Sequence, residues 1–204
     1  MKSKSIIISL MIIILIAILI LFSALTDTGI TDIKQTKNLF ILEEEKKIVQ
    51  SIEGSKEDIT VVLQEGNNAE YVIYIDEERY KFVKGENSDL ITTKEPLEEK
   101  YPEVSMEIKQ YNKISPKEMV AIIEEEIATK YTTVTETESI TEPIIGYKLH
   151  GISGSEWNSP VINIYVVDNH LEGSFVITEK YFLEAAEGHG ARFYAMVQQF
   201  KIKE

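Results

Sequence analysis

The sequence predicts an α+β protein: a single N-terminal transmembrane helix, then an exported domain of mostly antiparallel β-strands packed with one or two amphipathic helices. Three observations support this fold class. Residues 6–25 are apolar and uncharged, several later segments alternate apolar and polar residues as half-buried strands do, and residues 114–131 carry helix start signals. We divide the chain into a cytoplasmic tip with its anchor (1–25), a tether (26–38) and an extracytoplasmic region (39–204), with a candidate subdivision into 39–111 and 112–204.

The apolar run "IIISLMIIILIAILILFSAL" has the length of a membrane span. A helix of 20 residues is about 30 Å long, which matches the hydrocarbon core of a bilayer. Lys2 and Lys4 precede the run, whereas Asp27 and Asp32 follow it. The positive-inside rule therefore places the N-terminus in the cytoplasm and the remainder of the chain outside the cell membrane.

A cleaved signal peptide is the alternative interpretation of the same segment. Signal peptides have an apolar region of about 7–15 residues that ends at a small-x-small cleavage site. This run is longer, and Ser23-Ala24 makes a poor site. We therefore expect an uncleaved, single-pass signal anchor.

The charge balance is strongly acidic, with 34 Asp and Glu against 21 Lys and Arg and a net charge of −13. Nucleic-acid binding needs a basic surface that displaces counterions from phosphates, so we expect no nucleic-acid partner. The absence of cysteine excludes disulfides, thiolate zinc sites and a cysteine nucleophile.

The first half of the exported region predicts one short helix and several strands. Ile41, Ile48 and Ile52 stand at helical spacing in "FILEEEKKIVQSIEG", and with Gly54 as a stop they predict the helix. Two alternating segments flank the turn-rich "EGNNA" and predict a hairpin, which "RYKFVKG" should extend as a third strand. Further predictions are an irregular segment at 85–102 and a strand at 103–111, in which Val104, Met106 and Ile108 alternate.

Residues 114–131 carry the clearest local pattern. Ser115, Pro116 and Glu118 form a capping box with proline at the first helical position. Ile114 and Met119 stand where a hydrophobic staple would place them. This predicts an amphipathic helix that lies on a sheet, with its run of glutamates as a solvated face.

The second half adds two strands, "IIGYKLHGIS" and "VINIYVVDN", and then a long terminal hairpin. If Gly188-His189 is the turn, Phe175 opposes Ile202 and the strands pair apolar residues on one face. This register places His189 at a solvated tip. The helix followed by meandering strands over residues 115–202 resembles cystatin-type folds and the small anchored PepSY-type domains, which implies a similar architecture.

The loop "SGSEWNSP" carries Trp157, the only tryptophan of the chain. Tryptophan is enriched at binding hot spots, although a loop tryptophan can also fold back over the edge of the core. We take Trp157, Asn158, His189 and Arg192 as candidate partner-binding residues.

Catalytic patterns are not found in the sequence. None of the three histidines has a second ligand at metal-binding spacing, "GISGS" departs from the nucleophile elbow at Ser155, and there is no phosphate-binding loop. We therefore expect no enzyme, no cofactor and no metal. The expected function is a non-catalytic interaction or assembly module with an envelope protein partner. The alternative is an envelope enzyme or small-ligand-binding domain with a pocket between helix 115–131 and the sheet, lined in part by His150.

Overall fold

The computed structural model describes residues 42–203, so the predicted anchor (6–25) and tether (26–38) lie outside the described residues. The described chain is an α+β fold of mostly antiparallel sheets with two α-helices. Neither of these helices has the length and hydropathy that a membrane span requires.

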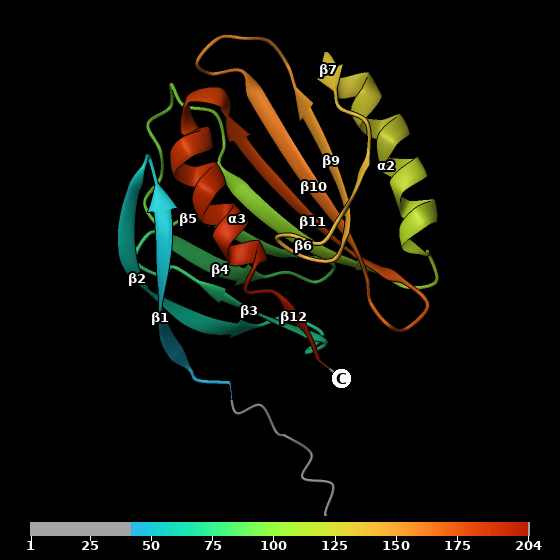
Figure 1. Ribbon diagram of the computed structural model, residues 1–204, viewed down its shortest axis with the longest axis horizontal. Helices are drawn as coiled ribbons and strands as arrows, with labels where there is room; N and C mark the ends of the chain where they lie inside the picture. The colour runs from blue at the N-terminus through green and yellow to red at the C-terminus, as the bar shows by residue number, and fades with distance from the viewer. Residues whose placement is uncertain (1–41, 204) are drawn as a thin grey trace, which may run out of the picture. The chain divides into compact units, whose positions relative to one another are not determined.

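Two antiparallel sheets form the body of the domain (Figure 1). The smaller sheet has the order β1 (Glu45–Ile52), β2 (Ser55–Glu65), β3 (Tyr71–Ile75) and β12 (Lys201–Ile202). The larger has the order β4 (Tyr80–Lys84), β5 (Asp89–Thr93), β6 (Ser105–Tyr111), β11 (Ser174–Phe182), β10 (Pro160–Asp168), β9 (Gly146–Ile152) and β7 (Thr133–Val134), with β8 (Glu138–Ile140) also paired to β9. Strands β5 and β6, which precede residue 112, belong to the same sheet as β9, β10 and β11, which follow it, and β6 pairs directly with β11.

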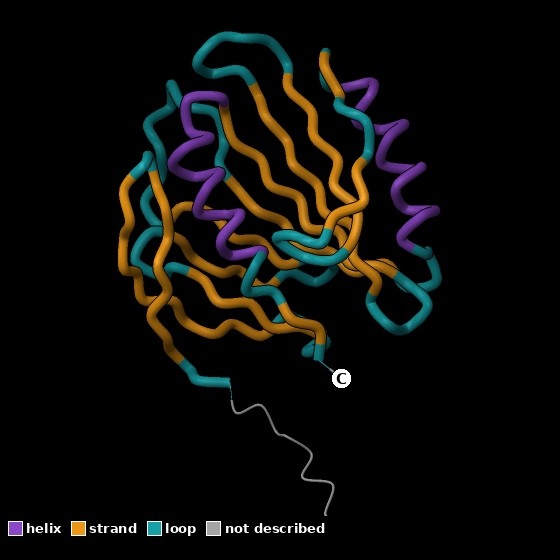
Figure 2. The backbone as a smooth tube through the Cα atoms, viewed as in Figure 1, coloured by secondary structure: helices purple, strands orange, loops and turns teal. Residues whose placement is uncertain are grey.

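The helical segments cover opposite faces of the large sheet (Figures 1 and 2). Helix α2 (Pro116–Lys130) packs Met119, Ile123 and Ile127 on strands β9 to β11. On the other face lie α3 (Ala191–Val197) and the small sheet, which share the main core with the large sheet. A 3-10 turn η1 (Leu183–Ala185) and a π-helical turn η2 (Ala186–Gly190) lead into α3.

Several predicted elements are confirmed. The hairpin around "EGNNA" is β2–β3, the two later strands are β9 and β10, and the strand at 103–111 is β6, with Val104, Met106 and Ile108 buried. Helix α2 has the predicted capping box, with Ser115 and Glu118 each bonded to the backbone of the other. These elements were predictable because their signals are local.

The helix predicted in "FILEEEKKIVQSIEG" is wrong for its described residues, 42–54, because they contain β1. Ile48 and Ile52 are four residues apart, which fits one helix face and also one strand face. Along β1 the side chains alternate between more and less exposed positions, and Gln50 lies in phase with both isoleucines. Glu53 and Gly54 have positive φ values of 50° and 77°, as the tight turn between β1 and β2 requires. Gly54 is therefore a hairpin residue and not a helix stop.

Strand β4 forms where "RYKFVKG" predicts a strand, but it does not extend the first hairpin. The Asp76 carboxylate accepts hydrogen bonds from the backbone N–H groups of Glu78 and Arg79. It also forms an ion pair with the Arg79 guanidinium at 3.0 Å. The chain leaves the small sheet at this turn, and β4 pairs with β5. The segment 85–102, predicted to be irregular, contains β5.

The predicted terminal hairpin is also wrong. The chain after β11 is helical, and β12 pairs with β3 instead of β11. Phe193, Val197 and Phe200 are buried at the spacing of a helix face. Gly190 has φ −59° and makes no turn. A Cβ there would lie 3.0 Å from Cζ of Tyr181, so this glycine permits η2 to approach the β11 side chain.

Candidate functional site

The loop that carries Trp157 is closed by hydrogen bonds of its own backbone. Ser153 N–H donates to Pro160 O at 3.0 Å, and Ser159 N–H donates to Glu156 O at 2.9 Å. Gly154 has φ +103°, and a Cβ there would lie 2.8 Å from the Ser159 hydroxyl oxygen. The loop is therefore closed at its base and across its tip.

Contacts with Glu184 of η1, with Phe182 of β11 and with Tyr101 position the tryptophan itself. Glu184 N–H donates to Trp157 O at 2.9 Å. The indole ring stands edge-on to Tyr101 and to Phe182, with centroids 5.8 and 6.0 Å away. Trp157 nevertheless stays 43% exposed. The indole therefore packs against aromatic side chains at the edge of the core and also exposes part of its own surface to solvent.

The Trp157 surface, defined as Trp157, Tyr101, Lys100 and Glu184, borders a shallow cavity of about 390 Å³. Lys100 lies 4.8 Å from the centre of the Tyr101 ring and pairs with Glu98 at 3.0 Å. Asn158 is exposed on the same loop. Two of the four predicted partner-binding residues therefore lie together.

His189 is not at a solvated tip, so that prediction is wrong. It is half-buried in η2, with Nδ1 2.7 Å from the hydroxyl oxygen of Tyr80 and its ring against Phe193. Burial, followed by the charge of Arg192, lowers the pKa of the imidazole. His189 joins η2 to β4 across a large sequence separation.

Arg192 likewise connects distant elements. Its side chain is 13% exposed, and its terminal nitrogen lies 3.5 Å from Oε2 of Glu57, which also lies 3.9 Å from Arg79. Glu57 on β2 thus links two guanidinium groups. His189 and Arg192 form a cluster apart from the residues of the Trp157 surface.

A row of polar side chains crosses the inner face of the large sheet, opposite α2. Asn163 lies directly across from His150 on one side and from Glu179 on the other. Their neighbours in phase along the strands, including Val161, Tyr165 and Ile177, belong to the apolar core. The polar row therefore occupies interior-facing positions whose neighbours along each strand are apolar.

Hydrogen bonds connect this row. The Asn163 amide nitrogen donates to Oε2 of Glu179 at 2.9 Å and to the Tyr181 hydroxyl at 2.7 Å. Its oxygen lies 2.9 Å from Nδ1 of His150. Because an amide oxygen accepts and does not donate, Nδ1 carries the proton, and Nε2 of a neutral His150 is an acceptor.

Glu179 is fully buried, and its Oε1 has no hydrogen-bond partner among residues 42–203. Burial raises the pKa of this carboxyl to about 8, against the smaller effects of the Asn163 bond and the Lys148 charge. The acid is therefore predominantly neutral at pH 7. A cavity of about 330 Å³ opens beside the row, lined by Thr135, Glu138, Lys148, His150, Asn163 and Tyr181.

The alternative site beside α2 is a groove of about 410 Å³. Its walls include Ile123 and Ile127 of the helix and Thr178 of β11. Its charged side chains are of both signs: Lys109, Lys130, Lys180, Glu107 and Glu126. His150 does not line it, contrary to expectation, because His150 and the buried Leu149 alternate along β9 and Leu149 faces α2.

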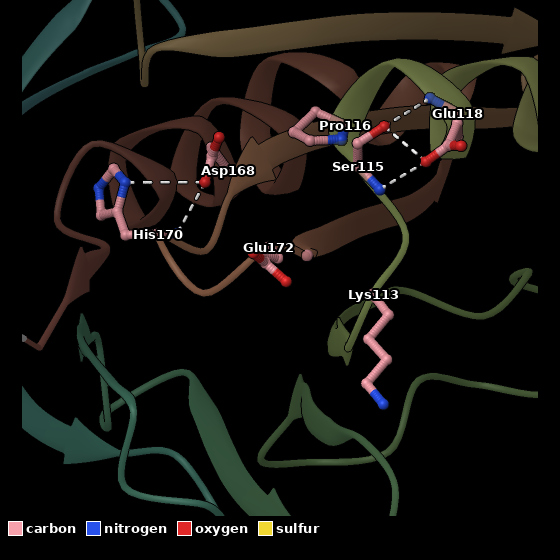
Figure 3. Close-up of a pocket in the computed structure, with 8 residues that line it drawn as sticks. Lys113, Ser115, Pro116, Glu118, Asp168, His170 and Glu172 are labelled. Carbon is pink, nitrogen blue, oxygen red and sulfur yellow. Dashed lines mark hydrogen bonds and ion pairs between the residues drawn. The ribbon is translucent and has the colours of Figure 1, made fainter.

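A hollow of about 750 Å³ lies at the start of α2 beside the β10–β11 turn. Figure 3 shows Ser115 facing Glu118, and His170 facing Asp168. These contacts are the capping box and a local turn, so they explain most of the polar groups without a ligand. No group of three or more His, Asp or Glu suited to a metal ion occurs within residues 42–203.

The sequence carries a signal for the polar row, although none of the four predicted partner-binding residues belongs to it. Glu179 and Asn163 stand in phase with the buried residues of two strands, where a polar side chain is unusual. Their contact was not predictable, because the expected terminal hairpin gives Glu179 a partner strand that the fold does not provide.

No protein-family model and no curated protein sequence matches this chain. Among solved structures, the fold is similar to that of the E65A mutant of protein Mog1. The TM-score is 0.46 with 10% sequence identity, and the match covers 70% of this chain and 95% of that chain. A similarity of this degree gives no information about function.

Proposed function

We propose that this protein is a non-catalytic binding module, tethered to the outer face of the cell membrane, that contacts an envelope protein through the Trp157 surface. One observation carries the proposal: Trp157 is 43% exposed although a closed loop and two aromatic rings hold it in place. Tryptophan and tyrosine dominate binding hot spots because they bury a large area on contact.

The rigidity of the loop favours binding as well. A side chain that is already ordered loses little conformational entropy when a partner covers it. The bonds from Ser153 to Pro160 and from Glu184 to Trp157 supply this order in the free protein. The proposed partner therefore meets a preformed aromatic surface.

The tether follows from the sequence. Residues 6–25 would cross the membrane with Lys2 and Lys4 in the cytoplasm, and residues 26–38 would link the span to the domain. The acidic charge of the exported region disfavours contact with anionic headgroups, so the partner is a protein and not the lipid surface.

The test is crosslinking of the full-length protein in its native membrane, followed by mass spectrometry. Trp157→Ala should abolish a reproducible set of crosslinked envelope proteins. Leu171→Ala is the matched control, because Leu171 is 62% exposed on the β10–β11 turn. If Trp157→Ala remains folded and retains every crosslinked protein, the Trp157 surface is not the contact site.

The groove beside α2 favours a second candidate function, the binding of a small amphiphile. Ile123 and Ile127 supply apolar walls, and the ammonium groups of Lys109 and Lys180 would attract a carboxylate. Lys130 already pairs with Glu126 at 2.5 Å. Octanoate is a suitable probe in saturation-transfer NMR. Thr178→Trp should fill the groove and abolish the signal; an unchanged signal would refute this site.

A further inference from the structure

The cavity beside the polar row carries two opposite charges that do not pair with each other. Glu138 on β8 lies directly across from Lys148 on β9, and both line the cavity. Side chains in this relation have Cβ atoms about 5 Å apart, so ion pairing is within reach. Within residues 42–203, however, the ion pairs found include neither residue. Each charge is therefore available to a ligand.

The wall of the cavity supplies a hydroxyl donor of fixed position. The Tyr181 oxygen accepts a hydrogen bond from Asn163, which leaves its own proton free to donate. Burial, and then the neighbouring Glu179, raises the pKa of this phenol to about 12, so the proton is retained at neutral pH. Gly190 packs on the Tyr181 ring and Asn163 holds the hydroxyl, which fixes this donor beside the cavity.

We propose that this cavity binds a small zwitterion of the α-amino acid class. The ligand carboxylate pairs with the Lys148 ammonium and accepts a hydrogen bond from the Tyr181 hydroxyl, while the ligand ammonium pairs with Glu138. The volume of about 330 Å³ is at the lower end for small-molecule sites and suits a ligand of this size.

The charge distribution selects a zwitterion over an ion of one sign. A simple anion meets Glu138 and a protein of net charge −13, whereas a simple cation meets Lys148. A zwitterion satisfies both side chains at once. The neutral Glu179 acts as a positioning residue, since it holds the Asn163 amide from behind without adding a second negative charge.

The test uses the full-length chain in lipid nanodiscs and isothermal titration calorimetry with a panel of L-α-amino acids. For the tightest binder, the N-acetyl derivative removes the ammonium and the amide removes the carboxylate. Each derivative should bind at least about tenfold more weakly, because each loses a charge-assisted contact.

The variants assign these losses to residues. Lys148→Gln and Glu138→Gln should each weaken the parent ligand about tenfold. Glu138→Gln should also remove most of the discrimination against the N-acetyl derivative. Lys117→Gln and Glu125→Gln make the same charge changes on the exposed face of α2 and should leave affinity unchanged.

Three outcomes would overturn the proposal. The first is that no amino acid of the panel binds with a Kd below about 10 mM. The second is that the N-acetyl derivative or the amide binds as tightly as the parent. The third is that Lys148→Gln and Glu138→Gln bind as the wild type does. These outcomes leave the Trp157 surface untouched, so the two proposals fail independently.

Discussion

Replacement of Glu179 by glutamine should make the stability of the domain less sensitive to pH. The carboxyl is fully buried, one oxygen has no partner among the described residues, and its pKa is raised from 4.5 to about 8. The folded state therefore retains a proton that the unfolded state releases above pH 4.5. Glutamine resembles the neutral acid in shape and can still accept the bond from Asn163.

The sign and the size follow from linkage. The unfolded chain binds fewer protons than the folded one between pH 4.5 and about 8, so stability falls as pH rises through this window. With these pKa values the wild type loses about 3–4 kcal/mol between pH 5 and pH 8 because of Glu179 alone. This is a large part of the stability of a typical domain, which is about 5–15 kcal/mol.

The assay is urea unfolding of the full-length chain in detergent, followed by the fluorescence of Trp157, the single tryptophan. The free energy of unfolding of Glu179→Gln minus that of the wild type should increase by about 3–4 kcal/mol from pH 5 to pH 8. The matched control is Glu125→Gln on the exposed face of α2, which should show no such increase. A difference between Glu179→Gln and wild type that is equal at both pH values would refute the argument.

Three further predictions concern local structure. Gly190→Ala places a Cβ 3.0 Å from the Tyr181 ring and should lower the free energy of unfolding by about 1–3 kcal/mol in thermal unfolding. Gly188→Ala, whose nearest contact is 3.5 Å, should leave it unchanged. Equal effects of the two substitutions would contradict the close approach at Gly190. Ser115→Ala removes the N-cap of α2 and should cost about 1 kcal/mol in urea unfolding, and no change would contradict the capping role. His189 should titrate below pH 6.5 by NMR, so its stabilising contribution is lost as pH falls below that value; a pKa of 6.5 or higher would contradict its burial.

Much of the fold was predictable where a local signal had one structural meaning. A capping box such as that of Ser115 and Glu118 is specific to the start of a helix, and α2 begins there. The alternation of Val104, Met106 and Ile108 fits a strand and does not fit a helix face. Such signals are read within a few residues.

The errors arose where one pattern fits two structures. The four-residue spacing of Ile48 and Ile52 fits helix and strand, and only pairing with β2 decides between them. Glycines in "EGHGARF" suit a turn, yet Gly190 is needed for close packing against Tyr181, a contact set by tertiary structure. Long-range packing, which a single sequence does not display, decided both cases.

The candidate sites divide in the same way. Trp157 and Asn158 could be found as an unusual loop composition, and they lie together on the surface. The contact of Asn163 with Glu179 depends on the register of β10 against β11 and was not available from spacing. His189 and Arg192 were chosen from a turn that the fold does not contain.

Site-specific photocrosslinking in the native membrane tests the central claim most directly. A photoreactive residue at Asn158 should capture the same envelope protein in repeated experiments, and the capture should disappear when Trp157→Ala is added. The same probe at Leu171, on the exposed β10–β11 turn, should not capture that protein. Equal capture from both positions, or capture at Asn158 that survives Trp157→Ala, would contradict the assignment of the Trp157 surface as the partner contact.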